Sequence, residues 1–273
     1  MSNGWDPIPL NSCDEAFQEF VKLQGKRWLC RGQSGRHGRS LLPSIDRNGW
    51  HTLSRAAKLQ LERRSINLFQ SAAQYFVQGE EEARSDDIVA LLVLRHYGVP
   101  TRFLDWSMSP YVAAYFAVQH DDAQPGELWC FDEPRYETEA GPRQWRRYPE
   151  ATLGRTGLGK DFRAGITAFE FGNPPPWFVC ILYNGLSGFP RQKAQHGAFS
   201  MTPDFGRDHS VAISDLFEHD SSAYCLYEIP AKLKPELRRL LREDHCIWRG
   251  SLFPDAAGAA ETVLKEVFPC CRL

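Results

Sequence analysis

The chain has 273 residues, of which 42% are hydrophobic and 24% are charged, and its formal net charge is −2. A chain of this length and composition can bury one large core, so we expect a single domain. The nearly balanced charge excludes a global basic field, so any contact with nucleic acid has to use a local patch.

Two negative observations bear on the cellular location. No apolar run approaches the roughly 20 residues that a membrane-spanning helix needs, and the first residues lack a signal-peptide pattern. We therefore expect a cytoplasmic protein with no membrane partner.

The eight cysteines form no Cys-x-x-Cys pair, which is the usual sign of a zinc or redox site. Buried thiols behave as small hydrophobic groups, so we expect reduced core thiols and no metal. Four of the cysteines lie in apolar stretches: Cys30, Cys130, Cys180 and Cys225.

The first predicted elements are a helix and a short strand. Ser12 and Glu15 form a capping-box pattern at the start of a helix that ends at Gly25. The strand 28–34 then carries Arg31 next to Gly32. A guanidinium at the end of a buried strand needs an anionic partner, and a glycine beside it allows close approach to the backbone. A ligand phosphate satisfies both, and an internal salt bridge is the alternative.

A polar loop, 33–48, precedes a long helix predicted over 53–78. Glu62 lies on the apolar face of this helix, where a carboxylate is costly unless it is paired. We expect Glu62 to orient a buried base, with Arg31 or Arg47 as the candidates.

The stretch 96–110 has the densest polar chemistry in the chain. A helix over 86–95 stops at His96 and Tyr97, because Gly98 and a proline follow. The run 101–106 predicts a strand, and Ser109 with Pro110 starts an apolar, buried helix.

The polar residues of this stretch lie near the start of the buried helix, whose free N–H groups favour an anionic ligand. We expect Thr101, Arg102, Asp105 and Ser107 to form a binding site. The alternative is that Asp105 and Ser107 only cap the helix while Arg102 pairs with a carboxylate.

The second half of the chain supplies further strands, predicted at 126–132, 177–183 and 223–229. Between the first two lies an extended surface insertion at about 133–173, where arginines alternate with aromatic residues as in single-stranded nucleic-acid surfaces. Arg191, Gln195 and His196 form a second polar cluster. Helices are predicted over 233–242 and towards 268.

These blocks together resemble the FRG-domain family of bacteria and phages, named for an aromatic-Arg-Gly motif, although Cys30 stands in the aromatic position. The resemblance covers most of the chain and implies one FRG domain over 1–273. The matching blocks are residues 28–33, 42–44, Glu62 with Phe69, 96–107, 115–117, 191–199 and 252–255.

A more distant resemblance is to ADP-ribosyltransferases, in the order of an Arg-Gly strand, a polar strand with a following helix, and a later polar strand start. It implies an α+β fold with a mixed or antiparallel core flanked by helices, and NAD as substrate. In such enzymes the first arginine holds NAD, the second strand shapes the nicotinamide pocket, and a carboxylate stabilises the ribosyl cation. Catalytic roles then fall to Arg31, Asp105 and Gln195, and NAD binding to Arg31, Gly32, His96, Tyr97, Thr101, Arg102, Asp105, Ser107 and Tyr115.

The third motif departs from that pattern, because Gln195 stands in place of a glutamate. A neutral amide can bind a ribose hydroxyl but cannot offset a developing positive charge. Asp105 or Glu228 is expected to substitute.

Three functions follow as hypotheses. The first is an NAD-dependent mono-ADP-ribosyltransferase, the toxin of a toxin–antitoxin or anti-phage system, which modifies RNA or protein and is held by an antitoxin. The second is a noncatalytic module that binds a nucleic acid or nucleotide. The third, a metal-free hydrolase with His96 or His196 as base, lacks a nucleophile at recognisable spacing.

Overall fold

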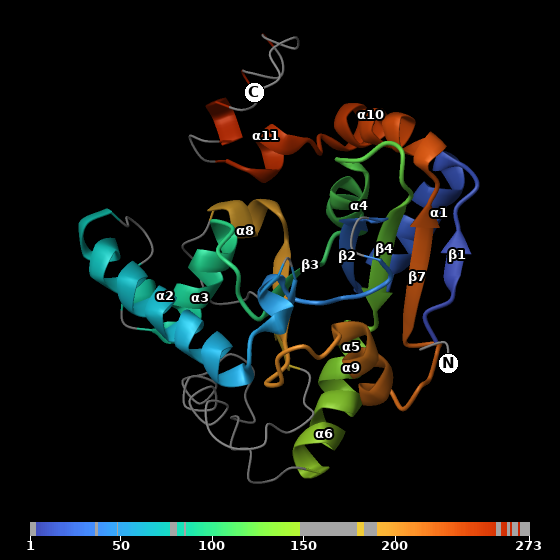
Figure 1. The fold of residues 1–273 in the computed structure, drawn as a ribbon. Coiled ribbons are helices and arrows are strands. Elements are labelled where there is room, and N and C mark those ends of the chain that lie inside the picture. The colour runs from blue at the N-terminus through green and yellow to red at the C-terminus, as the bar shows by residue number, and fades with distance from the viewer. Residues whose placement is uncertain are drawn as a thin grey trace.

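The computed structural model describes residues 4–35, 38–47, 49–76, 81–84, 86–147, 179–182, 190–254, 258–260, 263 and 267. These residues form one mixed sheet with helices on both faces (Figure 1), which confirms the predicted α+β class. None of the described helices is both long and apolar enough to span a bilayer.

The sheet has seven strands in the order β1-β7-β4-β2-β3-β6-β5. The β1–β7 pair is parallel, and every other neighbouring pair is antiparallel. The strands are β1 (Pro7–Pro9), β2 (Leu29–Ser34), β3 (Phe103–Ser107), β4 (Gly126–Phe131), β5 (Val179–Leu182), β6 (Gly197–Met201) and β7 (Tyr224–Ile229).

The contact between β2 and β3 is much shorter than the others. It consists of one residue pair, Cys30 opposite Ser107, whereas β2 pairs with β4 over six residues and β3 with β6 over five. The two strands diverge beyond this pair, so the sheet opens at its centre along Arg31 and Asp105.

Helices cover the two faces of the sheet in separate layers. The α-helices are α1 (Cys13–Gly25), α2 (Arg55–Phe76), α3 (Asp87–His96), α4 (Pro110–Val118), α5 (Glu133–Arg135), α6 (Gly141–Arg147), α8 (Pro190–Ala194), α9 (His209–Leu216), α10 (Lys234–His245) and α11 (Arg249–Leu252). One core joins α1, α4 and α10 to the strands through Phe20, Ala113 and Leu237. The other lies under α9 and includes Trp129 and Ile213.

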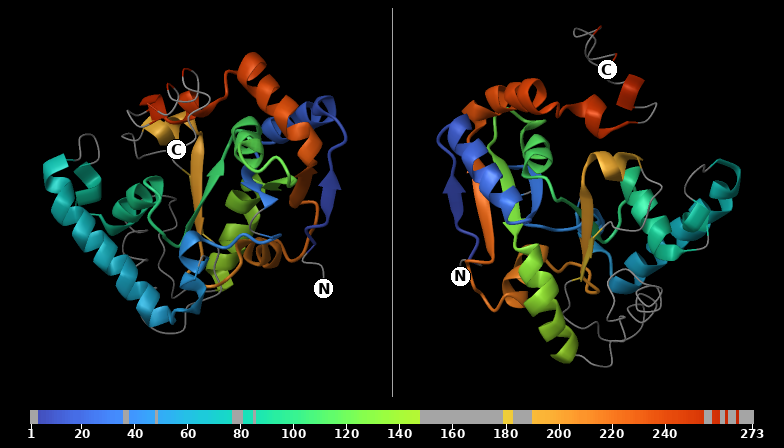
Figure 2. Two further views of the ribbon diagram at one scale, coloured as in Figure 1. Left: turned by 45° about the horizontal axis from the view of Figure 1, so that its top comes forward. Right: turned by 180° about the vertical axis from the view of Figure 1, so that it is seen from behind.

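The helices α2 and α3 project from the β6 side of the molecule, away from β1, as both views of Figure 2 show. Two buried ion pairs attach α2 to the rest of the chain: Lys58 with Asp46, and Glu62 with Arg102. The expected partners of Glu62, Arg31 and Arg47, were therefore wrong. The alternative in which Arg102 pairs with a carboxylate is confirmed.

The helix starts follow the local sequence closely. Ser12 accepts a hydrogen bond from the N–H of Glu15, and Ser109 caps α4 with Pro110 in the first turn. Ser109 is the N-cap of α4, as expected, so the alternative in which Asp105 and Ser107 cap this helix was wrong.

In the first part of the predicted insertion, α5, a π-helical turn (Tyr136–Ala140) and α6 follow β4. Tyr136 and Ala140 are buried in the core under α9, which ties this part to the sheet. Residues 148–173 and most of the helix expected towards 268 lie outside the described residues.

Candidate functional site

A cavity of about 390 Å³ lies where β2 and β3 diverge. Residues 30–34 of β2 and 105–107 of β3 form two of its walls. The remaining walls come from α4, α8 and the end of α3. A cavity of this size falls in the range of small-molecule sites, about 300–1,000 Å³.

Arg31 points from β2 across the opening towards β3. Its Nη1 donates a hydrogen bond of 2.6 Å to the main-chain oxygen of Asp105 and lies 3.8 Å from the Oδ2 of that residue. Its Nε is buried and has no hydrogen-bond partner. Burial lowers the pKa of Arg31 to about 9, Asp105 opposes that shift, and Arg95 and Arg47 add to it. The group therefore remains a cation at neutral pH.

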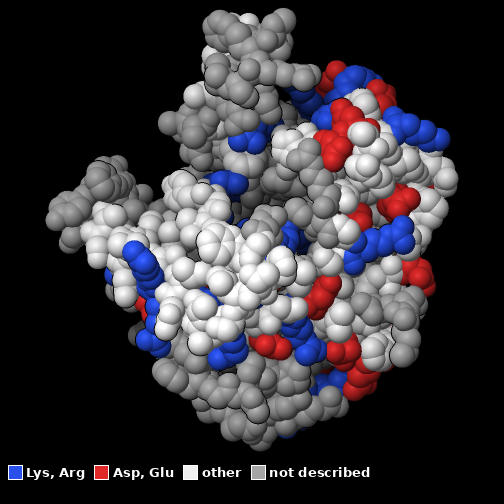
Figure 3. Space-filling view, viewed as in Figure 1, with Lys and Arg blue, Asp and Glu red and all other residues white. Residues whose placement is uncertain are grey.

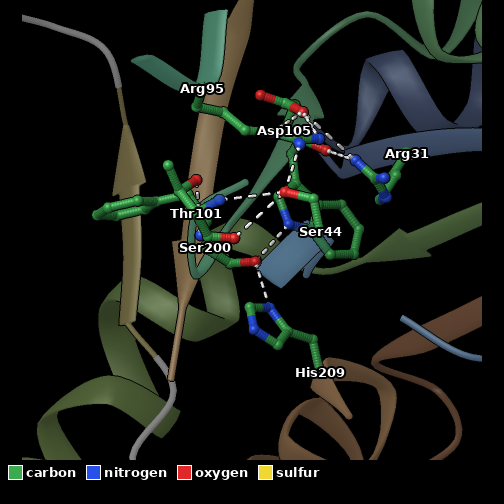
Figure 4. Close-up of polar contacts among 9 residues, drawn as sticks. Arg31, Ser44, Arg95, Thr101, Asp105, Ser200 and His209 are labelled. Atoms are coloured by element: carbon green, nitrogen blue, oxygen red, sulfur yellow. Dashed lines mark hydrogen bonds and ion pairs between the residues drawn. The ribbon is translucent and has the colours of Figure 1, made fainter. Parts of the chain in front are cut away.

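Asp105 is the acidic residue of the cavity wall, and it is held between two arginines (Figure 4). Arg95 donates from Nε and Nη2 to the same oxygen, Oδ2, at 2.9 and 2.6 Å. The Asp105 side chain is 45% exposed, so Oδ1 can meet a ligand. Burial raises the pKa of Asp105, but Arg95 and Arg31 outweigh it, and the pKa lies below the ordinary value. Asp105 is therefore ionised at neutral pH.

Arg95 was not among the predicted site residues, although its place in the last turn of an apolar helix next to Gly98 was visible in the sequence. Its Nη1 donates to the Oγ of Ser44 at 3.0 Å, and that oxygen also accepts from the N–H of Thr101. Ser44 thus fixes Arg95 relative to β3.

Positive charge dominates the cavity. Four arginines line it, Arg31, Arg47, Arg95 and Arg191, against one carboxylate, that of Asp105. Arg191 donates to the main-chain oxygen of His96 at 2.7 Å, and its guanidinium lies 4.0 Å from the ring centre of Phe253. On the face seen in Figure 3, by contrast, basic and acidic side chains are interspersed over the right-hand half. The cavity is thus a focused site for an anion.

Gln195 and Ser107 close one side of the cavity. The Ser107 hydroxyl donates to the main-chain oxygen of Gln195 at 2.7 Å, and the Gln195 amide nitrogen donates to the main-chain oxygen of Leu252 at 3.0 Å. The side-chain oxygen of Gln195 accepts no hydrogen bond from the described residues. His96 also lines the cavity, whereas His196 does not.

Gly32 packs closely against helix α4. A Cβ at this position would lie 1.7 Å from the main-chain oxygen of Ala113 and 2.6 Å from the nitrogen of Ala117. Helix α4 therefore packs directly against the backbone of Gly32, which also lines the cavity.

Four of the predicted site residues do not line the cavity. Thr101 is fully buried, and Arg102 is buried against Glu62. Tyr115 belongs to the core under α4, and Tyr97 is 65% exposed at the end of α3. Beside Tyr97 and Tyr115, the neighbouring residues His96, Gly98 and Phe116 line the cavity instead.

Behind the cavity, a buried polar pair supports β3 and β6. Ser200 accepts a hydrogen bond from the Trp106 ring N–H at 2.7 Å and lies 2.8 Å from Nδ1 of His209 (Figure 4). Burial lowers the pKa of His209 to about 3, and repulsion from Arg31 and Arg207 adds to the shift. The imidazole is therefore neutral, and nothing in the sequence pattern had marked it.

Comparison with known proteins identifies one family. The family model described as FRG domain matches residues 26–125, which is 100 of the 273 residues. The range includes β2, α2, α3, β3 and α4, and with them Arg31, Arg47, Arg95 and Asp105. It ends before α8, which contributes Arg191. A search of the curated proteins and a search of the solved structures each found no match.

Proposed function

We propose that this FRG-domain chain binds NAD in the arginine-lined cavity and transfers its ADP-ribose group to an RNA or protein acceptor. The observation that carries the proposal is the convergence of four guanidinium groups around one ionised carboxylate in a cavity of about 390 Å³. Guanidinium groups bind phosphate oxygens in bidentate geometry. A pyrophosphate is therefore the part of NAD that Arg31 and Arg95 would hold.

The transfer step assigns a separate role to Asp105. The glycosidic bond between C1′ of the ribose and the nicotinamide nitrogen breaks, and its electron pair leaves with neutral nicotinamide. The positive charge that develops on the ribose faces Oδ1 of Asp105, which has no hydrogen bond within the described part of the chain. An acceptor nucleophile then adds to C1′ and loses its proton to solvent. The free side-chain oxygen of Gln195 can accept a ribose hydroxyl.

A second candidate function is a noncatalytic module that binds a nucleotide. It is favoured by one observation: two arginines already offset the charge of Asp105, with Nη2 of Arg95 at 2.6 Å and Nη1 of Arg31 at 3.8 Å. A carboxylate that is already paired stabilises a developing cation less than a free one does.

Two variants and one control separate these functions. The purified full chain is incubated with labelled NAD and total RNA or cell lysate, and both nicotinamide release and label transfer are measured. Asp105→Asn should keep NAD binding but lose about 10²–10³-fold in release, whereas Arg31→Ala should lose binding. Arg39→Ala, at an exposed ion pair with Glu228 outside the cavity wall, should behave as the wild type.

The outcomes discriminate clearly. NAD binding without release or transfer by the wild type would leave the binding module as the function. A wild-type chain that binds no NAD would exclude both uses of this dinucleotide. The family resemblance extends the proposal to a toxin controlled by an antitoxin, in which case expression of the wild type, but not of Asp105→Asn, should arrest bacterial growth.

A further inference from the structure

We infer that Arg47 forms a second phosphate subsite in the cavity, for a phosphate monoester in addition to the pyrophosphate. This inference rests on the proposed function, since it assigns the pyrophosphate to Arg31 and Arg95. It names the substrate class more narrowly: either the dinucleotide carries a 2′-phosphate, as NADP does, or the acceptor brings a terminal phosphate of its own.

The backbone around Arg47 is fixed by buried contacts. Arg47 directly follows a 3-10 turn (Ser44–Asp46). Ser44 is bonded to Arg95 and to the N–H of Thr101, and Asp46 forms a 2.6 Å ion pair with Lys58. Arg47 is therefore placed at the cavity wall by the fold.

The guanidinium of Arg47 has no hydrogen-bond or ion-pair partner among the described residues, and its Nε is buried. The neighbouring Asp46 forms an ion pair with Lys58, and the cavity carboxylate of Asp105 accepts hydrogen bonds from Arg95. Burial lowers the pKa of Arg47 and repulsion from Arg95 adds to that shift, while attraction to Asp105 opposes it. A half-buried cation that lies next to other cations without a direct partner is typical of an anion-binding group.

The balance of charge points to the same conclusion. The four cavity arginines exceed its one carboxylate by three charges. A pyrophosphate brings two negative charges, so one guanidinium remains uncompensated when it is bound. Arg191 stacks on Phe253 and donates to the main-chain oxygen of His96, whereas Arg47 has no partner among the described residues. Arg47 is therefore the residue that the third phosphate would meet.

The test measures binding by calorimetry on the full chain, with Arg47→Gln as the variant and Arg39→Gln as the matched control. One arm compares NADP with NAD. The other adds a short RNA, with or without a 5′-phosphate, to the chain saturated with NAD. Charged hydrogen bonds contribute about 1.5–3 kcal/mol, so the phosphorylated ligand should bind about 10- to 150-fold tighter in one arm. Arg47→Gln should abolish that preference, and NAD affinity should change by no more than a few fold.

Three outcomes decide the matter. No preference in either arm, or an equal loss of NAD and NADP affinity in Arg47→Gln, would overturn the inference, the latter because it places Arg47 in the pyrophosphate site. Adenosine 2′,5′-bisphosphate provides a readout that does not need NAD. If the wild type binds this compound, Arg47→Gln does not, and the wild type releases no nicotinamide from NAD, the phosphate subsite is supported while the transfer proposal fails. Arg47→Lys keeps the cation and should retain the preference for the phosphorylated ligand. Equal thermal unfolding midpoints of the wild type and Arg47→Gln show that a loss of binding is not a loss of folding.

Discussion

Removal of the negative charge of Glu62 should destabilise the protein without touching the cavity. Glu62 and Arg102 are each 4% exposed. Glu62 Oε1 accepts from the Arg102 N–H and Nε, at 3.2 and 3.1 Å, and Oε2 accepts from Nε at 2.9 Å. Glu62→Gln leaves the Arg102 charge buried against the ring of Phe205, 4.3 Å away, with no carboxylate. Breaking one side of a buried ion pair costs about 3–5 kcal/mol.

The measurement is urea unfolding followed by circular dichroism. A loss of about 3–5 kcal/mol should lower the urea midpoint at an unchanged slope, and lower the thermal midpoint by about 2 °C per kcal/mol. Glu228→Gln, which removes the partner of the exposed Arg39, should cost less than about 1 kcal/mol. The double variant Glu62→Leu with Arg102→Met should recover most of the loss, because no charge stays buried. Equal midpoints for Glu62→Gln and Glu228→Gln would refute this account of how α2 is attached.

Two further predictions concern stability. Gly32→Ala should lower the free energy of unfolding in urea by at least about 2 kcal/mol, because the added Cβ meets main-chain atoms of α4. The control Gly25→Ala should not, because no atom lies within 4 Å of a Cβ at that position. Equal stabilities of the two variants would show that α4 can shift freely. Burial and Glu137 raise the pKa of Glu133 to about 7, while Arg27 lowers it, so the folded state holds a proton that the unfolded state has released. The contribution of Glu133 to stability should therefore be greatest below about pH 4.5, fall by up to about 3 kcal/mol as the pH rises towards about 7, and stay constant above it. Glu133→Gln should remove this fall, and an unaltered pH profile would contradict the assignment.

Local sequence signals predicted most elements of the fold, because caps and turns depend on neighbouring residues. Ser12 and the Ser109–Pro110 pair mark the starts of α1 and α4 within one residue. Gly98, with a φ of 86°, ends α3 as expected. The helices in the first part of the insertion were not predicted, since its buried residues Tyr136 and Ala140 are too few to give a helical period.

The cavity itself depends on distances that no local pattern contains. Arg31 and Asp105 were each predicted as site residues, and both line the cavity, where Arg31 donates to the main-chain oxygen of Asp105. The arginines that join them come from the end of an apolar helix and from a loop, at Arg95 and Arg47, where a charged residue is usually solvated. The partner of Glu62 was likewise decided by the fold, 40 residues away in sequence.

Under the proposed transferase activity, the position of Asp105 would let its carboxylate take the part of the glutamate that Gln195 replaces. Its strand pairs with β6 through Phe199 but meets β2 only at Ser107, so the Asp105 carboxylate stands at the open edge of the sheet. Gln195, in contrast, has its amide nitrogen bound to the chain beyond α10 and is neutral. Arg95 keeps Asp105 ionised and oriented through Oδ2 alone, which leaves Oδ1 for the ligand. Arg95 thus has two opposite effects on Asp105: it weakens the carboxylate as a counter-charge, and it keeps the carboxylate ionised and oriented. The Asp105→Asn variant measures which effect is larger.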